Sequence, residues 1–287
     1  MSKIYLIDKR VGWTSHDVVG KSKRLLNTKK VGHCGTLDPF ATGLLVVFSN
    51  HATKLARFIE AEDKTYIATL KLGERTASGD TEGSVIETKE VPSLDEKIIN
   101  NVLASFIGKQ SQLPPMYSAL KVDGRRLYEY ARENVEVERK AREIEIFDIK
   151  LLSYKDNILE FEVSCSKGTY VRVLGEDIAS RLNTVGHLIA LRRTRIGAYK
   201  IEDAIDVEEV SKEKGIDLYH ALSFMDRHFI KDEEYSDIFN GKDLIVNSDK
   251  QYVVVCDYHE HALAIYEKVG VNKYHCCRGL WGLRWKK

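Results

Sequence analysis

The sequence has 287 residues, of which 43% are hydrophobic and 30% charged, so the chain can bury a sizeable core and is expected to form one or two domains. Its longest apolar run lies near residues 44–48, far below the roughly 20 residues that span a bilayer, which excludes a membrane protein with spanning helices. Residues 1–8 hold too short an apolar stretch for a signal peptide, and five scattered cysteines fit reduced thiols. We therefore expect a cytoplasmic protein.

The charge is nearly balanced overall but unevenly distributed. There are 44 basic and 43 acidic residues, which gives a net charge of +1. Residues 1–60 hold ten Lys or Arg and four Asp or Glu (+6), whereas residues 201–237 hold four and twelve (−8). Basic surface at one end of a chain is typical of proteins that bind a phosphate-bearing partner.

The first 60 residues predict two strands and two helices around a loop. A strand is expected at residues 4–7, and Thr14 and Ser15 offer an N-cap for a helix that runs to about residue 27. Three glycines and a proline make residues 32–43 a loop, which is followed by a buried strand at 44–48 and a helix at 52–59. The side chains of the first helix that are expected to face inward are Val18, Val19, Ser22, Leu25 and Leu26.

The middle of the chain predicts more strands and two more helices. Alternating apolar residues indicate strands at 66–72, 144–146 and 159–165. Ser93 and Glu96 form a capping-box pattern for a helix that ends before residue 108, and Thr169 can cap a helix over 171–182. The mixture predicts an α+β fold with hairpin-like strand pairs.

The acidic stretch of residues 201–237 contains little that resembles a core strand. Apolar strand patterns resume at Ile245, at 252–256 and at 262–266. We therefore expect a boundary near residue 224. It separates a domain at 1–223, large enough to be a catalytic domain, from a small β-rich module at 224–287.

Asp38 is the carboxylate that local pattern alone favours for chemistry. It lies in the glycine-rich loop and precedes Pro39, which holds it in an extended conformation. The structural alternative is an Asx-turn that caps its own loop. His33 in the same loop is either a base or nucleic-acid contact, or a hydrogen-bonded loop histidine.

Six ordered motifs resemble the bacterial tRNA pseudouridine synthase B family. The run KVGHCGTLDPFATGLL at residues 30–45 is similar to the catalytic signature of that family. The others, in chain order, are DKRVGWTSHD at 8–17, KTYIA at 64–68, LGERTASGDTEG at 72–83, PPMYSALKVDGRR at 114–126 and GTYVRVLGED at 168–177. The matches extend over residues 4 to about 200, roughly two thirds of the chain.

The resemblance implies a fold and a reaction. The fold is a pseudouridine synthase core with a mixed, mainly antiparallel sheet flanked by helices, an RNA-gripping insertion at about 110–142 and a C-terminal PUA-like RNA-binding module. The reaction isomerises the T-loop uridine at tRNA position 55 after base flipping. Asp38 would act as nucleophile, Tyr66 would stack on uracil and remove the C5 proton, and Arg172 would orient Asp38 and keep it charged.

The resemblance also implies a substrate-binding set and no cofactor. His33 would fill the space left by the flipped base, while Tyr170 and Leu191 would line the uracil pocket. The enzyme would need neither metal nor organic cofactor. It would act as a monomer, would not associate with a membrane, and would bind the T-arm stem-loop of tRNA. The remaining candidates for substrate or phosphate contact are Lys9, Asp80, Lys121, Arg125, Arg126 and the run Arg192, Arg193, Thr194 and Arg195.

Two positions depart from the family pattern. Arg10 stands where the family usually has proline, and Cys34 replaces the usual threonine after the histidine. The second change places an oxidisable thiol four residues from Asp38.

Two other functions are compatible with parts of the sequence. A non-catalytic tRNA-binding protein or RNA chaperone could share the scaffold, but it would have no reason to keep Asp38, Tyr66 and Arg172 together. A hydrolase could use Asp38 and Asp80 as a carboxylate pair, which would leave the basic N-terminal region unexplained.

The C-terminal cysteines and histidines also raise the question of a zinc site. Zinc is not expected there, because the chain has no CxxC pair and adjacent cysteines on a strand point to opposite faces. The residues concerned are Cys256, His259, His261, His275, Cys276 and Cys277.

Overall fold

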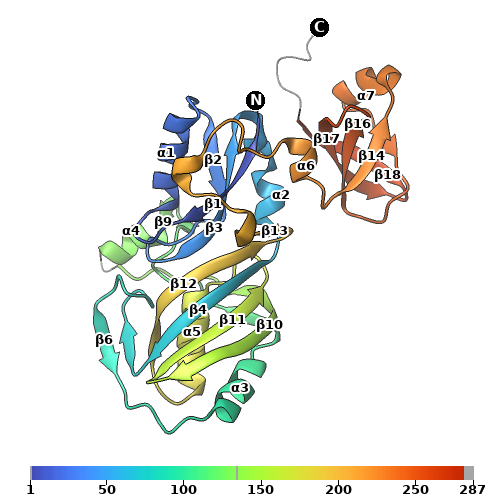
Figure 1. Cartoon of the computed structure of the whole chain (residues 1–287). Coiled ribbons are helices and arrows are strands. Elements are labelled where there is room, and N and C mark those ends of the chain that lie inside the picture. Colours follow the sequence, from blue (N-terminus) through green and yellow to red (C-terminus); the bar gives the residue numbers. More distant parts are fainter. Residues whose placement is uncertain (1, 134, 281–287) are drawn as a thin grey trace.

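The computed structural model describes residues 2–133 and 135–280, which form two large sheets with helices around them and two short two-stranded sheets. The larger sheet has nine strands in the order β1-β3-β12-β4-β11-β10-β7, with β13 paired to β12 and β2 paired to β3. Figure 1 shows the C-terminal strands as a separate curled sheet beside the first. The predicted α+β class with a mixed, mainly antiparallel sheet and a β-rich C-terminal module is confirmed.

The elements of the larger part alternate strands with short helices. The strands are β1 (Ile4–Lys9), β2 (Val31–Cys34), β3 (Thr42–Ser49), β4 (Lys64–Leu72), β5 (Glu74–Thr76), β6 (Val85–Thr88), β7 (Gly108–Gln112), β8 (Lys121–Val122), β9 (Arg125–Arg126), β10 (Arg142–Lys155), β11 (Ile158–Cys165), β12 (Gly186–Ile196) and β13 (Tyr199–Lys200). The helices are α1 (Ser15–Leu25), η1 (Asn50–Leu55), α2 (Ala56–Glu60), α3 (Glu96–Ala104), α4 (Leu127–Arg132), α5 (Val171–Arg181), η2 (Ile201–Asp203) and η3 (Val207–Glu209).

The C-terminal part follows a short helix, α6 (Leu218–Ala221). Its five-stranded sheet has the order β14-β16-β17-β18-β15. Its elements are β14 (Asp226–Ile230), η4 (Asp232–Glu234), α7 (Tyr235–Phe239), β15 (Leu244–Ile245), β16 (Tyr252–Asp257), β17 (Ala262–Gly270) and β18 (Lys273–Gly279).

Strand β3 explains how one short apolar run organises the first half of the chain. Leu44, Val46 and Phe48 pack in one cluster with residues of η1, α2 and the C-terminal sheet. Leu45 and Val47 face the other side and pack with helix α1. A strand covered on both faces must be apolar at every position, as this run is.

Helices α3 and α5 cover one face of the sheet half formed by β4, β10, β11 and β12. Their apolar side chains, such as Ile99 of α3 and Leu174 of α5, join one buried cluster with residues of these strands. The helix predicted over 171–182 packs its apolar stripe in this way because residues three and four apart share a face.

Helix α1 confirms its predicted cap, with one error in its buried face. The Thr14 side chain accepts a hydrogen bond from the Asp17 backbone, and Asp17 bonds back to Thr14, as in a capping box. Leu25 was expected to face inward, but it is 40% exposed at the end of the helix, whereas Leu26 is buried as expected.

Two other caps lie at residues different from those predicted. Helix α3 begins after Asp95, whose side chain accepts from the Ile98 backbone, so Ser93 is not the cap. Helix α5 begins after Tyr170, while the Thr169 hydroxyl donates to the Ser166 carbonyl in the preceding loop.

Several strands were missed, among them β2 and β12 of the larger sheet. Residues 31–34 form the edge strand β2, so the loop predicted at 32–43 is shorter than expected. Strand β12 is eleven residues long and lies between β3 and β4 in the centre of the sheet, although its sequence carries three arginines in four residues. We interpreted residues 192–195 as a phosphate-binding run and therefore predicted no strand there.

Gly43 lies where β3 and β12 come closest. Its φ is +99°, and a Cβ atom placed there would lie 2.3 Å from the backbone oxygen of Arg193. We expect Gly43→Ala to lower the free energy of unfolding by about 3 kcal/mol, because the strands must separate and the backbone is strained. Chemical denaturation measures this loss, with Gly20→Ala as control, since Gly20 has open space around it. Equal stability of the two variants would contradict the expected collision.

The acidic stretch lies against the basic N-terminal region and includes a strand. Asp206 pairs with Arg10 at 2.7 Å, and Glu208 pairs with Lys21 at 2.5 Å. Part of the basic charge of residues 1–60 is therefore already neutralised. Strand β14 falls within the stretch that was expected to hold little core strand, and it pairs in parallel with β16.

The cysteines and histidines of the C-terminal sheet do not converge. Cys276 packs inside this sheet, whereas Cys277 faces the cluster shared with β3 and α2. His261 and His275 pair separately, with Asp257 and Asp243. Within the described residues, no group of three or more His, Cys, Asp or Glu could hold a metal ion, and no helix is long and apolar enough to cross a membrane.

Candidate active site

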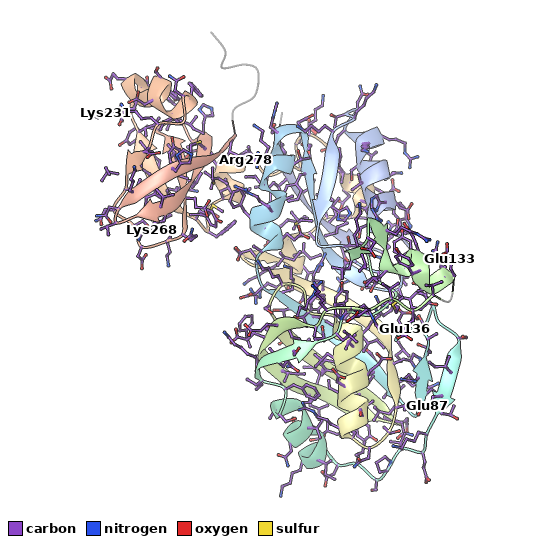
Figure 2. The ribbon with its side chains drawn as sticks, turned by 180° about the vertical axis from the view of Figure 1, so that it is seen from behind. Glu87, Glu133, Glu136, Lys231, Lys268 and Arg278 are labelled. Atoms are coloured by element: carbon purple, nitrogen blue, oxygen red, sulfur yellow. The ribbon has the colours of Figure 1, made fainter. Side chains whose placement is uncertain are left out.

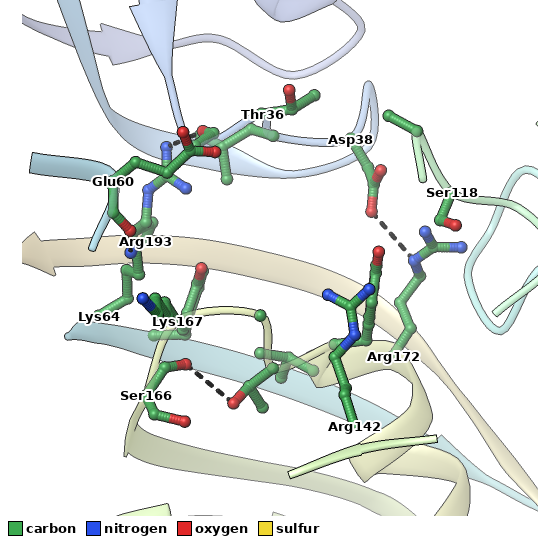
Figure 3. Close-up of a pocket in the computed structure, with 18 of the residues that line it drawn as sticks. Thr36, Asp38, Glu60, Lys64, Ser118, Arg142, Ser166, Lys167, Arg172 and Arg193 are labelled. Atoms are coloured by element: carbon green, nitrogen blue, oxygen red, sulfur yellow. Dashed lines mark hydrogen bonds and ion pairs between the residues drawn. The ribbon is translucent and has the colours of Figure 1, made fainter. Parts of the chain in front are cut away.

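A cavity of about 850 Å³ opens between the loop before β3, strands β4 and β12, the start of α5 and the segment after β7 (Figure 3). It brings together six of the residues singled out by the sequence. They are Asp38, Tyr66, Tyr170, Arg172, Leu191 and Arg193. His33, Lys9, Asp80 and Lys121 do not line it.

Asp38 is held by a loop whose backbone is fixed on both sides. The Ser15 hydroxyl accepts from the Leu37 backbone at 2.9 Å, and the Asp38 carbonyl accepts from Ala41 at 3.1 Å. Lys9 donates to the Pro39 carbonyl at 3.4 Å. The N-terminal helix and strand thus determine where this carboxylate points.

Arg172 is the centre of the site. It is only 4% exposed, and its Nε lies 3.0 Å from the Asp38 carboxylate (Figure 3). Its Nη1 donates to the Ser78 carbonyl at 2.7 Å and lies 3.3 Å from Asp80, while Nη2 donates to the Tyr117 carbonyl at 2.7 Å. Asp80 is therefore positioned behind Arg172 rather than in the cavity, where a substrate contact was expected.

The environment of Asp38 opposes its charge on balance. Its side chain is 37% exposed, but this surface faces the cavity. Burial raises the pKa of the carboxyl, Arg172 counteracts that shift and Asp80 adds to it. Asp38 should therefore become protonated at a higher pH than an ordinary aspartate, and Arg172 limits the change.

Tyr66 and Leu191 come from adjacent strands and form the apolar side of the cavity. Tyr66 on β4 is 8% exposed and Leu191 on β12 is 7% exposed. Burial raises the pKa of the Tyr66 hydroxyl, and the positive charge of Arg193 opposes this rise. The hydroxyl is therefore neutral at pH 7 and forms its anion only with help from its surroundings.

Tyr170 closes the cavity at the start of α5. Its backbone N–H donates to the Gln112 side chain at 2.8 Å, and its carbonyl accepts from the same amide at 3.1 Å. The Arg142 guanidinium lies 5.8 Å from the centre of its ring. These two hydrogen bonds to Gln112 on β7 fix the backbone of Tyr170, an aromatic residue that lines the cavity.

His33 lies on β2, outside the cavity, with its ring against His16 at 5.5 Å. Burial, aided by the positive charges of His16 and Arg193, lowers the pKa of His33 to about 4. Its protonation therefore opposes folding as the pH falls from about 6.5 towards 4. We expect an NMR titration of the ring to show a midpoint near pH 4. A midpoint near 6.5 would contradict this burial.

Two predicted phosphate contacts are buried instead. Lys9 is 1% exposed and donates to the carbonyls of Arg10, Trp13 and Pro39. Arg193 is also 1% exposed. Lys9 is enclosed by these carbonyls, whereas Arg193 is buried but lines the cavity, so neither side chain lies on an open surface. The long side chains of arginine and lysine can reach and donate to the backbone carbonyls of a buried loop. Composition alone cannot show which basic residues do so.

The other members of the arginine run are partly committed to protein contacts. Arg192 forms a bidentate pair with Asp8, at 2.7 and 3.0 Å. Arg195 donates to the Thr65 hydroxyl and to the Gly197 carbonyl. Arg192 and Arg193 are adjacent on β12 and point to opposite faces, and a bulge between Arg193 and Arg195 reverses the alternation, so the arginines do not form one basic patch.

The insertion carries a small hairpin and a helix. Lys121 is exposed on β8, and Arg125 on β9 pairs with Glu133 at 2.7 Å and lies over the Tyr130 ring. Arg126 on the same strand is half-buried. The Arg125–Glu133 pair neutralises part of the basic charge of the insertion, and Figure 2 shows Glu133 at the outer side of this segment.

Sequence reasoning missed the basic rim of the cavity. Arg57 on α2, Lys64 on β4, Arg142 on β10 and Lys167 in the loop before α5 all line it. Together with Arg172 and Arg193 they give six basic lining residues, against three acidic ones, which are Asp38, Glu60 and Glu143. Two of the missed residues had a sequence signal that could have pointed to them, since Lys64 opens the KTYIA motif and Lys167 directly precedes the GTYVR motif.

The comparisons with known proteins agree with this geometry. Residues 23–171 match the family model described as TruB family pseudouridylate synthase (N terminal domain). The tRNA pseudouridine synthase B of Hydrogenovibrio crunogenus is 48% identical over 211 residues, which cover 74% of this chain and 70% of that protein. The protein of the same name from Mesoplasma florum is 37% identical over 279 residues, which cover 97% and 98%.

Solved structures share the fold. A Cbf5-Nop10-Gar1 complex matches with a TM-score of 0.73 and 25% identity, over 94% of this chain and 79% of that chain. An H/ACA RNP bound to a substrate RNA containing 2'-deoxyuridine matches with a TM-score of 0.75 and 22% identity, over 99% and 86%. The second, at this identity, supports the fold alone.

Proposed function

Because this chain belongs to the TruB family of pseudouridylate synthases, we propose that it converts the T-loop uridine at tRNA position 55 to pseudouridine after flipping that base into the cavity. The observation that carries the proposal is the Asp38–Arg172 pair facing Tyr66 and Leu191 in one cavity. A volume of about 850 Å³ lies within the range of small-ligand pockets and accommodates one nucleotide.

Each residue has a role that fits its surroundings. Asp38 is the nucleophile, and Arg172 keeps its carboxylate charged against burial. Breaking the N1–C1′ bond frees the uracil, which turns and rejoins the ribose through C5. Tyr66 then removes the C5 proton, and Leu191 and Tyr170 confine the base while it turns.

The alternative functions are less well supported. Asp80 is buried against Arg172 and does not line the cavity, so it does not form a carboxylate pair with Asp38 around a substrate, as a hydrolase would need. A binding protein without catalysis would not need a buried guanidinium on its cavity carboxylate. The chemistry therefore favours isomerisation.

Release of tritium from tRNA labelled at uridine C5 tests the reaction directly. Isomerisation frees this hydrogen to water, whereas binding or hydrolysis of the glycosidic bond leaves it on the base. We expect stoichiometric release from an unmodified transcript and none from a transcript with cytidine at position 55. Binding without release would contradict the proposal.

The RNA should contact the cavity rim and the insertion. We propose Arg142 and Lys167 as phosphate contacts near the cavity, and Lys121 with Arg125 on the insertion hairpin. Reversing Lys121 and Arg125 to Glu should weaken tRNA binding and flatten its salt dependence, because each phosphate contact adds about −0.7 to −0.9 to the log-log slope.

Fluorescence titration at several salt concentrations measures this slope. The matched control reverses Asp148 and Glu162 to Lys, since these exposed or half-buried acids lie on β10 and β11 away from the cavity. An unchanged slope for the Lys121 and Arg125 variant would remove the insertion from RNA binding.

The proposal includes an organisation and a state for the protein. We propose a catalytic domain at 1–223 with the insertion at about 110–142, a PUA-like RNA-binding module at 224–287, and a cytoplasmic monomer. The boundary falls between α6 and β14, and the curled β-rich sheet supports the module. Light scattering of the protein with and without tRNA tests the monomer.

A further inference from the structure

Arg193 carries a buried charge that no acid neutralises. Its Nε donates to the Leu44 carbonyl at 2.8 Å and its Nη2 donates to the Gly35 carbonyl at 2.7 Å. Within the part of the chain that the structure describes, it forms no ion pair, whereas Arg172 pairs with two carboxylates. A buried cation without a counter-ion is costly, so a structural role in the loop alone does not explain it.

The strand register places Arg193 beside the proposed base. Arg193 on β12 is the direct partner of Tyr66 on β4, and both side chains line the cavity. The positive charge of the guanidinium on this neighbouring strand lowers the pKa of the Tyr66 hydroxyl, which burial raises. Figure 3 shows Arg193 on the side of the cavity opposite the Asp38–Arg172 pair.

The other groups around Tyr66 work in the opposite direction. Cys165 on β11 and Asp38 in the loop before β3 both raise the pKa of the hydroxyl. Arg193 is thus the group among these neighbours that favours the anion. It also holds the carbonyl of Gly35, three residues before Asp38.

We propose that Arg193 is a positioning residue for this reaction, which holds the Tyr66 hydroxyl and stabilises the phenolate that removes the C5 proton. The inference rests on the proposed function. Tyr66 first loses its proton to water. The phenolate oxygen then takes the proton from C5. The electron pair of the C5–H bond restores the C5–C6 double bond, and the C6–N1 double-bond pair moves to N1, which takes a proton from water. Tyr66 is then protonated as at the start, so no further reactant is needed.

Two variants separate the charge of Arg193 from its packing. Arg193→Gln removes the charge and Arg193→Lys keeps it. In single-turnover tritium release at saturating tRNA, we expect Arg193→Gln to be about 100-fold slower at pH 7, the lower end of acid–base effects. Arg193→Lys should recover at least about a tenth of the wild-type rate. The dissociation constant for tRNA should stay within about threefold in both.

The pH profile distinguishes this role from a merely structural one. The rate deficit of Arg193→Gln should narrow as the pH rises, because Tyr66 then ionises without help. A structural defect would lower the rate equally at every pH. The control is Arg181→Gln, which loses the same charge on α5 outside the cavity and should keep the wild-type rate.

Three results would overturn the inference. They are a rate for Arg193→Gln within threefold of wild type, equal losses in the Gln and Lys variants, or a loss that does not change with pH. If Arg193→Gln does not fold, ultraviolet titration of wild type and Arg193→Lys, with Tyr66→Phe as reference, replaces the kinetics. Tyr66 should ionise at higher pH in the Lys variant, and an unchanged midpoint counts against the inference. Absence of tritium release from wild type would instead refute the proposed function.

Discussion

Replacing Asp38 by Asn should abolish turnover while tRNA binding stays within about tenfold of wild type. The amide has the size of the carboxylate but cannot act as an anionic nucleophile. Because only the Arg172 contact at 3.0 Å is altered, the cavity should keep its shape. Single-turnover tritium release measures the rate, and filter binding measures the affinity.

Asp148→Asn serves as the matched control for this change. Asp148 is an exposed aspartate on β10 that lies outside the cavity, so its variant should turn over normally. A residual rate above a few per cent of wild type in Asp38→Asn would exclude Asp38 as the nucleophile.

Arg172→Met should remove activity and also destabilise the protein. The change leaves Asp80 buried, at 2% exposure, without its cation, and two backbone carbonyls lose a donor. Breaking a buried pair by removing one partner costs about 3–5 kcal/mol. Denaturant unfolding should show this loss, and tritium release should fall to background.

Arg172→Lys tests the electrostatic part separately. Lysine keeps the charge but cannot reach Asp38, Ser78 and Tyr117 at once. Since Arg172 lowers the pKa of Asp38, a weaker contact should raise that pKa further. The acid limb of the pH–rate profile should therefore move to higher pH than in wild type. A limb at the same pH would show that Arg172 does not control the ionisation of Asp38.

The sequence predicted the elements whose apolar periodicity is strong. Strands β1, β3, β4 and β11 and helix α5 lie where alternation or helical spacing placed them. Strand β12 was not predicted because its arginines interrupt the apolar pattern. These arginines contact β3, residues 8 and 35 and the start of β4. Local pattern cannot show that a charged side chain is buried by residues more than a hundred positions away.

The site was predicted only in part, because local motifs do not show which side chains the fold buries or brings together. Motif resemblance identified Asp38, Tyr66 and Arg172, which the structure brings to one cavity. It assigned Lys9 to phosphate, yet the ammonium lies inside the protein and serves three carbonyls. The basic rim residues Arg142 and Lys167 are 25 positions apart in the sequence (167 − 142) and line one cavity only in the folded chain.

The four contacts of Arg172 also have a consequence for the order of folding. They join residues 38, 78, 80 and 117 to residue 172, a span of 134 positions from the first to the last (172 − 38). Contacts between distant segments form late, because a long loop must close before they contribute. The β10–β11 hairpin, which closes over a two-residue turn, needs no such closure. During refolding, circular dichroism should therefore recover before catalysis does, and the first turnover marks the completion of the native structure.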